Sequence, residues 1–263
     1  MAEFTAKEGR SQTPEQVSAD HADLRAGIDD LAGLVAGSLG LPELLVEVAA
    51  FAVRAIPGAD GAGVTLLRLD RVDNMVAALA ASAPFVAAID EIQYVTLNEG
   101  PCITAVLDRR TVRSGSLGQE KMWPRFGPSV GRWGVHSALS LPLLLSEQVI
   151  GALNVYAYGR DVFDQHAVEL AELFAKPAAV AVHNAQILAD ALALTAKLRS
   201  ALSTRTVIDQ AIGVMLVTTG GSAEDALTQL QAMSQAEHRA LPDVAQHVID
   251  EVVRRARDRP MST

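Results

Sequence analysis

The chain has 263 residues, 49% of them hydrophobic and 20% charged, which is an ordinary composition for a globular protein of one or two domains. Its one cysteine, Cys102, excludes an internal disulfide and a cysteine-rich zinc or iron–sulfur site. The formal net charge is −9, and the excess acid lies in residues 1–195, with 14 basic against 23 acidic side chains, so any contact with a polyanion must be local.

The N-terminal segment gives no sign of a membrane or a packed core. Met1–Glu8 lacks the apolar stretch of a signal peptide, and no run of 18 or more uncharged apolar residues occurs in the chain. We therefore expect a cytoplasmic protein without membrane contact. Residues 1–20 are rich in Ser, Thr, Glu, Gln and Ala without apolar periodicity, and we predict that they are disordered.

Two helices and two strands follow. Apolar residues from Leu24 to Leu34 recur at helical spacing and predict a first helix that ends at Gly37. A second helix is predicted to begin at Pro42 and to end at Pro57-Gly58. Residues 61–70 and 75–82 then read as strands, with the turn at 70–74.

The clearest strand pair comes later, at His136–Leu145 and Gln148–Ala157. Leucines alternate along the first run and Val149, Leu153 and Val155 along the second, and the short polar Ser146-Glu147 joins them. This pattern predicts an antiparallel hairpin at the centre of a sheet. The turn-rich stretch 98–134 is long for a connection inside a domain, which is typical of a functional segment or of short helices.

This first part of the chain resembles a GAF domain, the small-molecule sensor module of many bacterial regulators. The resemblance covers about residues 41–190 and implies an antiparallel sheet flanked by helices. It rests on Pro84, Asp90, Gln93-Tyr94, Asn98–Cys102, Trp123-Pro124, Gly134–Ser137, Ser140–Leu143 and Ile150–Tyr156.

The GAF resemblance leaves the ligand of this part of the chain unidentified. The cyclic-nucleotide signature of some GAF domains is absent, and Ser114-Gly115-Ser116 replaces the usual acidic pair. We expect no metal and no other cofactor, because the six histidines lie at no metal-ligand spacing and no glycine-rich phosphate loop occurs. The candidate residues for binding an unidentified small molecule are Tyr94, Cys102, Trp123 and His136.

Each of these candidates also has a structural interpretation. A single free cysteine is commonly a small buried hydrophobe, and this is the favoured interpretation of Cys102. His136 begins a strand and is favoured as a hydrogen-bonded core residue. Trp123 and Trp133 either line a pocket or cover the edge of the sheet.

A continuous helix is predicted from about residue 164 to residue 217, which Pro177 should kink or bound. Within it, the apolar residues of segment 185–204 repeat at intervals of four and three, the spacing of a coiled coil. We therefore predict a parallel homodimer whose contact residues are Ile187, Ala191, Leu194, Leu198 and Ala201.

The last part of the chain holds three segments of helix length, each with an apolar stripe such as Ala211/Ile212 and Val248/Ile249. Ser222 is placed to cap the second segment, and Pro242 suits the first turn of the third. None of these segments could bury its stripe alone, so we predict a three-helix bundle over residues 205–256.

This bundle resembles an ANTAR domain. The resemblance rests on Arg205–Met215, Ser222–Leu227, Leu230, Ser234, His238–Leu241 and Val244-Ala245. In that family the bundle binds paired RNA hairpins as a dimer and acts in transcription antitermination. By this resemblance the candidate RNA-binding residues are Gln210, Gly213, Gln231, Ser234, Gln235, His238 and Arg239.

The sequence thus predicts an α+β protein with four parts: a disordered segment 1–20, a GAF-like sensor 21–190, a coiled-coil linker 185–204 and an all-α ANTAR-like bundle 205–256. We expect a regulator without catalytic residues that binds RNA hairpins, with a small molecule or an upstream signalling protein as its input and no DNA partner. The alternatives are a sensor or protein-interaction module with weak or no RNA binding, a GAF-based small-molecule-binding protein, a GAF-based enzyme and a DNA reader. The first alternative follows from Ile212, Gln231 and Ala240, which stand where the family often has basic side chains, because phosphate contacts carry most nucleic-acid affinity.

Overall fold

The structure is a computed structural model that describes residues 13–35, 39–67 and 76–257. The chain divides into two compact units, Met1–Ala189 and Asp190–Thr263, which we call unit 1 and unit 2. The predicted α+β class is confirmed, with strands in unit 1 and helices alone among the described residues of unit 2.

Unit 1 begins with helices α1 (Pro14–Val35) and α2 (Leu41–Ala55). The prediction of disorder was wrong for residues 14–20, because α1 has a start signal that apolar periodicity does not reveal. The Gln16 backbone N–H donates to the Thr13 hydroxyl (3.3 Å), and the Thr13 backbone N–H donates to Oε1 of Gln16 (3.1 Å), which is a capping box. The predicted helix end at Gly37 and the rest of segment 1–20 lie outside the described residues.

A five-stranded antiparallel sheet forms the centre of unit 1. Its strands are β1 (Gly61–Leu67), β2 (Val76–Ala81), β3 (Val112–Ser114), β4 (Ser137–Leu145) and β5 (Gln148–Ala157), in the order β2-β1-β5-β4-β3. The predicted hairpin is confirmed as β4–β5, and β5 is the central strand. The predicted turn at 70–74 lies outside the described residues.

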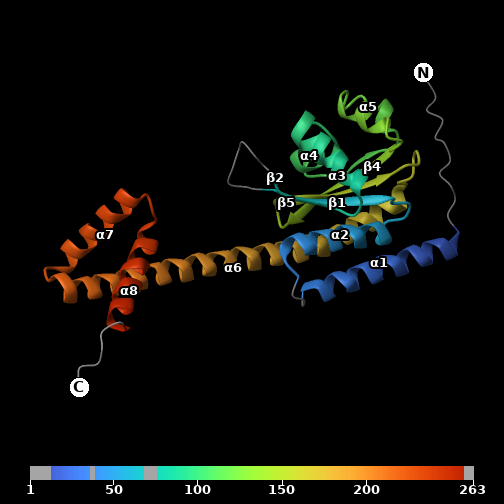
Figure 1. Cartoon of the computed structure of the whole chain (residues 1–263). Coiled ribbons are helices and arrows are strands. Elements are labelled where there is room, and N and C mark those ends of the chain that lie inside the picture. The colour runs from blue at the N-terminus through green and yellow to red at the C-terminus, as the bar shows by residue number, and fades with distance from the viewer. Residues whose placement is uncertain (1–12, 36–38, 68–75, 258–263) are drawn as a thin grey trace. The chain divides into compact units, whose positions relative to one another are not determined.

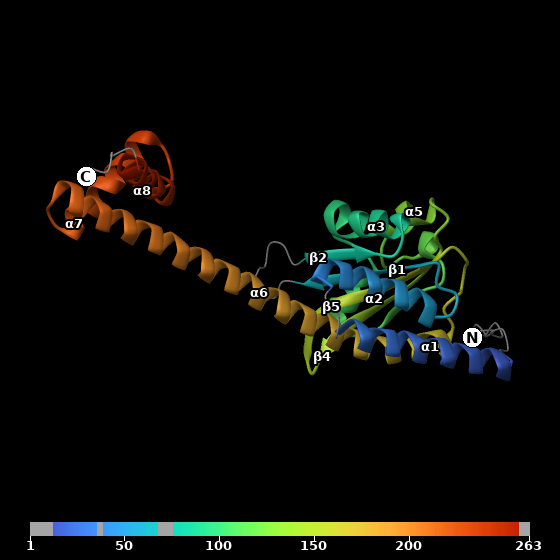
Figure 2. The same cartoon turned by 60° about the horizontal axis from the view of Figure 1, so that its bottom comes forward.

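Helices cover both faces of this sheet (Figures 1 and 2). Helices α1, α2 and the first part of α6 (Gln165–Thr219) pack on the face that carries Val64, Leu141 and Leu153. The other face is covered by α3 (Pro84–Glu91), the wide helical turn η1 (Ile92–Leu97), α4 (Pro101–Asp108), the short η2 (Leu117–Gln119) and α5 (Phe126–Gly131). Side chains of both parities are therefore buried along β1, β4 and β5.

Unit 2 consists of the last part of α6 with α7 (Ala223–Glu237) and α8 (Leu241–Arg257). The predicted stripes meet in one small core, whose buried members are Ala211, Met215, Ala226, Leu230, Val244 and Ala245. Ser222 caps α7 as predicted: its hydroxyl accepts from the Asp225 N–H (3.1 Å), and the Asp225 carboxylate accepts from the Ser222 N–H (3.1 Å).

Helix α6 continues through Pro177, so the prediction that this proline could bound the helix was wrong. A proline inside a helix removes one hydrogen-bond donor, but Phe174, Ala178 and Val182 bury their side chains in the core of unit 1 and hold the helix on both sides of it. By length and composition α6 is also the one described helix that could cross a membrane, and a single helix of this kind is weak evidence for a membrane span.

Candidate functional site

Unit 1 contains a cluster of polar side chains between the sheet and helices α3 to α4. Strand alternation places Thr65, Ser140 and Asn154 on this face of the sheet, opposite in parity to the predicted leucine stripe. We call the following set the buried polar cluster: Thr65, Asp90, Gln93, Tyr94, Cys102, Ser140, Asn154 and Tyr156.

Asn154 holds the centre of the cluster because it pairs in register with Gly63 on β1 and with Ser140 on β4. The Ser140 hydroxyl donates to Oδ1 of Asn154 (2.9 Å). A side chain at position 63 would meet Oδ2 of Asp90 at 2.7 Å, so the glycine makes room for the Asp90 carboxyl above the sheet. The fold therefore brings α3 onto β1 and β5 at this point.

The carboxyl group of Asp90 is buried, and its hydrogen bond comes from a neutral side chain. The Tyr156 hydroxyl donates to its Oδ1 (3.3 Å). Burial raises the pKa of Asp90 from 3.8 to about 7, although the hydrogen bond from Tyr156 and the nearby amide of Asn154 act in the opposite direction. The group is therefore only partly ionised near neutral pH.

Tyr94 and Cys102 meet in the cluster, as two of the four predicted ligand residues. The Tyr94 hydroxyl donates to the Thr65 hydroxyl (2.9 Å) and contacts the Cys102 sulfur. Oε1 of Gln93 accepts from the Cys102 backbone N–H (3.0 Å) at the start of α4. Burial raises the pKa of the Cys102 thiol to about 12, so the thiol is neutral and a poor nucleophile, in agreement with its favoured structural interpretation.

Three polar atoms of the cluster have no hydrogen-bond partner within the described chain: Oδ2 of Asp90, Nε2 of Gln93 and Nδ2 of Asn154. The Asn154 amide still lies close enough to Asp90 to favour its carboxylate form. Buried polar atoms are nearly always paired, so this set offers one carboxyl oxygen and two amide donors to a bound polar molecule or to water. No group of three His, Cys, Asp or Glu side chains able to hold a metal occurs in the described ranges.

The other two predicted ligand residues lie apart from these contacts. Trp123 is buried, and its Nε1–H donates to the Thr104 hydroxyl of α4 (2.9 Å), so it fills the core under α5. Trp133 is 48% exposed. The backbone of His136 extends the sheet, donating to the Ala157 carbonyl (3.0 Å), and its Nδ1 is buried without a partner among the described residues.

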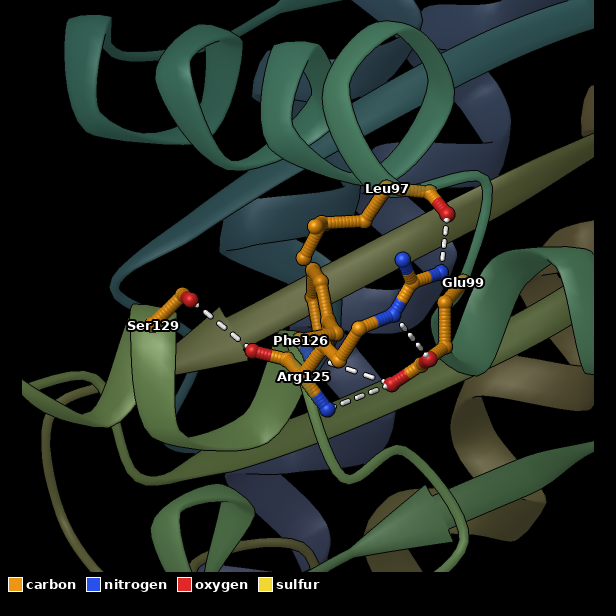
Figure 3. A network of polar contacts seen from close by, with 5 residues as sticks. All are labelled: Leu97, Glu99, Arg125, Phe126 and Ser129. Atoms are coloured by element: carbon orange, nitrogen blue, oxygen red, sulfur yellow. Dashed lines mark hydrogen bonds and ion pairs between the residues drawn. The ribbon is translucent and has the colours of Figure 1, made fainter.

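A polar network ties the loop before α4 to the start of α5 (Figure 3). Oε1 of Glu99 accepts from the backbone N–H groups of Arg125 (2.8 Å) and Phe126 (3.1 Å), and its Oε2 pairs with Nε of Arg125 (3.1 Å). The Arg125 guanidinium also donates to the Leu97 carbonyl (2.8 Å), and the Ser129 hydroxyl donates to the Arg125 carbonyl (2.8 Å). Burial opposes ionisation of Glu99, but the Phe126 and Arg125 N–H groups and the guanidinium together lower its pKa.

In unit 2 the predicted RNA-binding residues lie on two surfaces. Gln210 and Gly213 are exposed on α6, and Gln231 and Gln235 are exposed on α7. A side chain at position 213 would meet no atom within 4 Å, so nothing in the described protein requires a glycine there.

Ser234, His238 and Arg239 form the end of α7. His238 is the C-cap in the left-handed region (φ 53°), and the Ser234 hydroxyl donates to the Arg239 carbonyl (2.6 Å). The Arg239 guanidinium pairs with Glu237 (3.1 Å) and donates to the Asp243 carbonyl (3.4 Å). These residues thus have structural roles within the protein, and the imidazole of His238 is exposed.

The five predicted dimer residues are exposed on α6. Ile187, Leu194 and Leu198 are each more than half exposed, and Ala191 and Ala201 lie between them. The same helix carries further exposed large apolar side chains: Leu173, Val180, Leu188, Leu192 and Leu202.

Sequence reasoning did not identify Thr65, Gln93, Asn154 and Tyr156 as members of a site. The sequence did carry one signal for this site. Asn154 and Tyr156 alternate with apolar residues along β5, so they lie together on the face of the strand opposite to Leu153 and Val155. A half-exposed hairpin has polar residues at such positions, and only a sheet covered on both faces buries them.

Comparison with known proteins agrees with this geometry. The GAF domain family matches residues 38–183, and the ANTAR domain family matches residues 196–249. The chain is similar in structure to the GAF domain of a phosphoenolpyruvate-protein phosphotransferase from Coxiella burnetii, at 16% identity and a TM-score of 0.50, over 66% of this chain and 98% of the other. It is also similar to free methionine-R-sulfoxide reductase from Neisseria meningitidis, at 16% identity and a TM-score of 0.49, over 70% and 99% of the two chains. No curated protein matches it.

Proposed function

Because the chain belongs to the GAF domain family and also carries an ANTAR domain, we propose that it is a cytoplasmic transcription regulator in which unit 1 senses a signal and unit 2 binds RNA hairpins. Its biological output would be antitermination, through hairpins in nascent transcripts. The regulatory role rests on the pair of domains, and the RNA and antitermination steps are the proposal.

The observation that carries the RNA proposal is the surface around Gly213. A glycine inside a helix costs about 1 kcal/mol relative to alanine, and the space around position 213 is open. The exposed backbone at Gly213, one turn from the exposed amide of Gln210, is a place where RNA can approach the helix closely. Amide groups at Gln210, Gln231 and Gln235 can hydrogen-bond to unpaired loop bases.

We propose that α6 pairs with α6 of a second copy in parallel. Fully burying a leucine or isoleucine contributes about 1.5–3 kcal/mol, so the exposed halves of Ile187, Leu194 and Leu198 contribute about 1 kcal/mol each. This is small against the cost of association, about 4–15 kcal/mol. Leu173 and Val180 continue the series at seven-residue steps into unit 1 and lengthen the seam.

Asn184 gives this seam a defined register. It occupies the heptad position that Ala191 and Leu198 occupy one and two heptads later, and it is exposed. An asparagine at a single such position specifies the alignment of a parallel two-stranded coil, because two asparagines satisfy each other across the interface. Two RNA-binding units held in one dimer raise the effective concentration for paired hairpins.

The input of this regulator is proposed to act through the buried polar cluster. A small polar molecule that accepts hydrogen bonds from Gln93 and Asn154 would satisfy atoms that have no partner within the described residues. Its binding would shift the packing of α3 and α4 on the sheet, and α6, which packs on the opposite face, would transmit the change. An upstream signalling protein is the alternative input.

We propose that the protein has no catalytic activity. The single cysteine is buried with a raised thiol pKa, whereas a catalytic thiolate needs a lowered pKa and access to its substrate. An assay with free methionine sulfoxide tests this point, and turnover by the purified protein that is lost in Cys102→Ser would refute it.

The RNA proposal is tested by gel shifts with paired hairpins at increasing salt. Binding should weaken linearly in a log–log plot, because phosphate contacts release counterions. Duplex DNA of equal length is the control competitor. No binding at low salt would leave a sensor or protein-interaction module, an outcome consistent with the internal pairing of Arg239.

A further inference from the structure

The helices that form the core of unit 2 offer few cations to a polyanion. Lys197, Arg199 and Arg205 precede this core on α6, and Arg205 pairs with Asp209 (3.8 Å). Between positions 206 and 253 the only Lys or Arg is Arg239, against seven Asp and Glu. The Arg239 guanidinium is already held by Glu237 (3.1 Å) and by the Asp243 carbonyl (3.4 Å). Since phosphate contacts dominate nucleic-acid affinity, further cations next to these helices would strengthen RNA binding.

Such cations lie at the end of α8. The family match ends at residue 249, but the helix continues to Arg257 and presents Arg254, Arg255 and Arg257 on its exposed surface. Arg255 pairs with Glu251 one turn earlier. Arg254 and Arg257 make no hydrogen bond or ion pair with any other described residue, and the nearby Asp250 accepts from Gln246 (2.8 Å).

The helix dipole does not by itself account for three arginines in the last turns of α8. Positive side chains are favourable in the last turns of a helix, and the paired Arg255 already supplies one. Residues three apart on a helix are neighbours, so Arg254 and Arg257 place two positive charges side by side, an arrangement that a bound anion would stabilise. Guanidinium groups match phosphate oxygens in geometry and charge.

We propose that Arg254 and Arg257 contact the phosphate backbone of the RNA bound by unit 2, at a site beyond the family-matched segment. This inference rests on the proposed RNA binding and assigns it a source of electrostatic affinity. The amide groups of α6 and α7 would then contact loop bases, and α8 would contribute sequence-independent contacts.

The test compares the full-length wild type with Arg254→Gln/Arg257→Gln in hairpin binding from 50 to 300 mM KCl. Each lost phosphate contact reduces the magnitude of the log–log salt slope by about 0.7–0.9, so the double variant should lose about 1.4–1.8 from the slope. At 100 mM salt its affinity should fall on the order of 10- to 50-fold.

The matched control is Arg109→Gln/Arg110→Gln, which removes the same charge from an exposed turn of unit 1. It should keep the wild-type slope, and circular dichroism should show equal helix content in all three proteins. A wild-type slope in the α8 variant, or an equal loss in the control, would overturn the inference while leaving RNA binding intact. Failure of the wild type to bind any hairpin would refute the proposed function, and the inference with it.

Discussion

Replacing Asp90 with Asn should stabilise unit 1 at pH 8 and destabilise it near pH 4. The folded protein holds the Asp90 proton more tightly than the unfolded chain, with a pKa of about 7 against 3.8. Its contribution to stability is therefore complete below pH 3.8, is lost as the pH rises towards 7, and stays lost above that value.

The size of the effect follows from the two pKa values. A rise from 3.8 to about 7 corresponds to about 4 kcal/mol of destabilisation at pH 8, which an uncharged asparagine avoids. The asparagine places an N–H2 group where Oδ2 has no partner, at a cost of about 1–3 kcal/mol. The variant should thus be more stable than the wild type by about 1–3 kcal/mol at pH 8.

Urea unfolding followed by tryptophan fluorescence measures this difference, because both tryptophans, Trp123 and Trp133, belong to unit 1. Titrations of both proteins at pH 4, 5, 6, 7 and 8 should show the unfolding free energy of the variant, relative to the wild type, rising by about 4 kcal/mol across the series. Asp29→Asn, which removes an exposed carboxylate from α1, is the control and should follow the wild type. A gap that stays constant with pH would show that Asp90 is not a buried, proton-binding carboxyl.

Three further substitutions test other parts of the structure. Gly213→Ala should raise the melting temperature of unit 2 by adding about 0.5–1 kcal/mol, yet weaken hairpin binding in gel shifts; unchanged binding would argue against close approach there. Leu194→Asp/Leu198→Asp should convert dimers to monomers in sedimentation velocity and weaken RNA binding about 100-fold, whereas Ala193→Asp/Ala196→Asp on the opposite helix face should do neither. Glu99→Gln should lower the unfolding free energy of unit 1 by about 1–2 kcal/mol at pH 7. The difference should close as the pH falls below 4.5, because the contacts that lower the pKa of Glu99 stabilise only its ionised form. Equal differences in thermal unfolding at pH 3 and pH 7 would contradict the network of Figure 3.

The parts of the fold that local patterns specify could be predicted from the sequence. Alternating Leu141 and Leu153 lie in the β4–β5 hairpin as expected, and Ser222 caps α7, because strand alternation and helix capping depend on neighbouring residues. The start of α1 was missed because a capping box at Thr13 precedes the first apolar repeat. The continuous helix was predicted, but the alternative that Pro177 bounds it was wrong because tertiary packing of Phe174 and Ala178 holds the helix on both sides of the proline.

The candidate site was less accessible to sequence reasoning. Tyr94 and Cys102 meet because the wide turn η1 is capped by Asn98 in the left-handed region and α4 starts three residues later, a geometry without a periodic signal. Asn154 and Tyr156 belong to the cluster only because α3 and α4 cover a second face of the sheet. The raised pKa of Asp90 likewise depends on burial by segments distant in sequence.

The buried state of Cys102 has a practical consequence for spectroscopy. The chain has no other thiol, and this one is shielded from solvent and protonated at neutral pH, so maleimide reagents should leave the native protein unlabelled. A cysteine introduced at an exposed position would then carry a spin label or fluorophore alone. Distances between such labels on two copies could be measured without first removing the native residue.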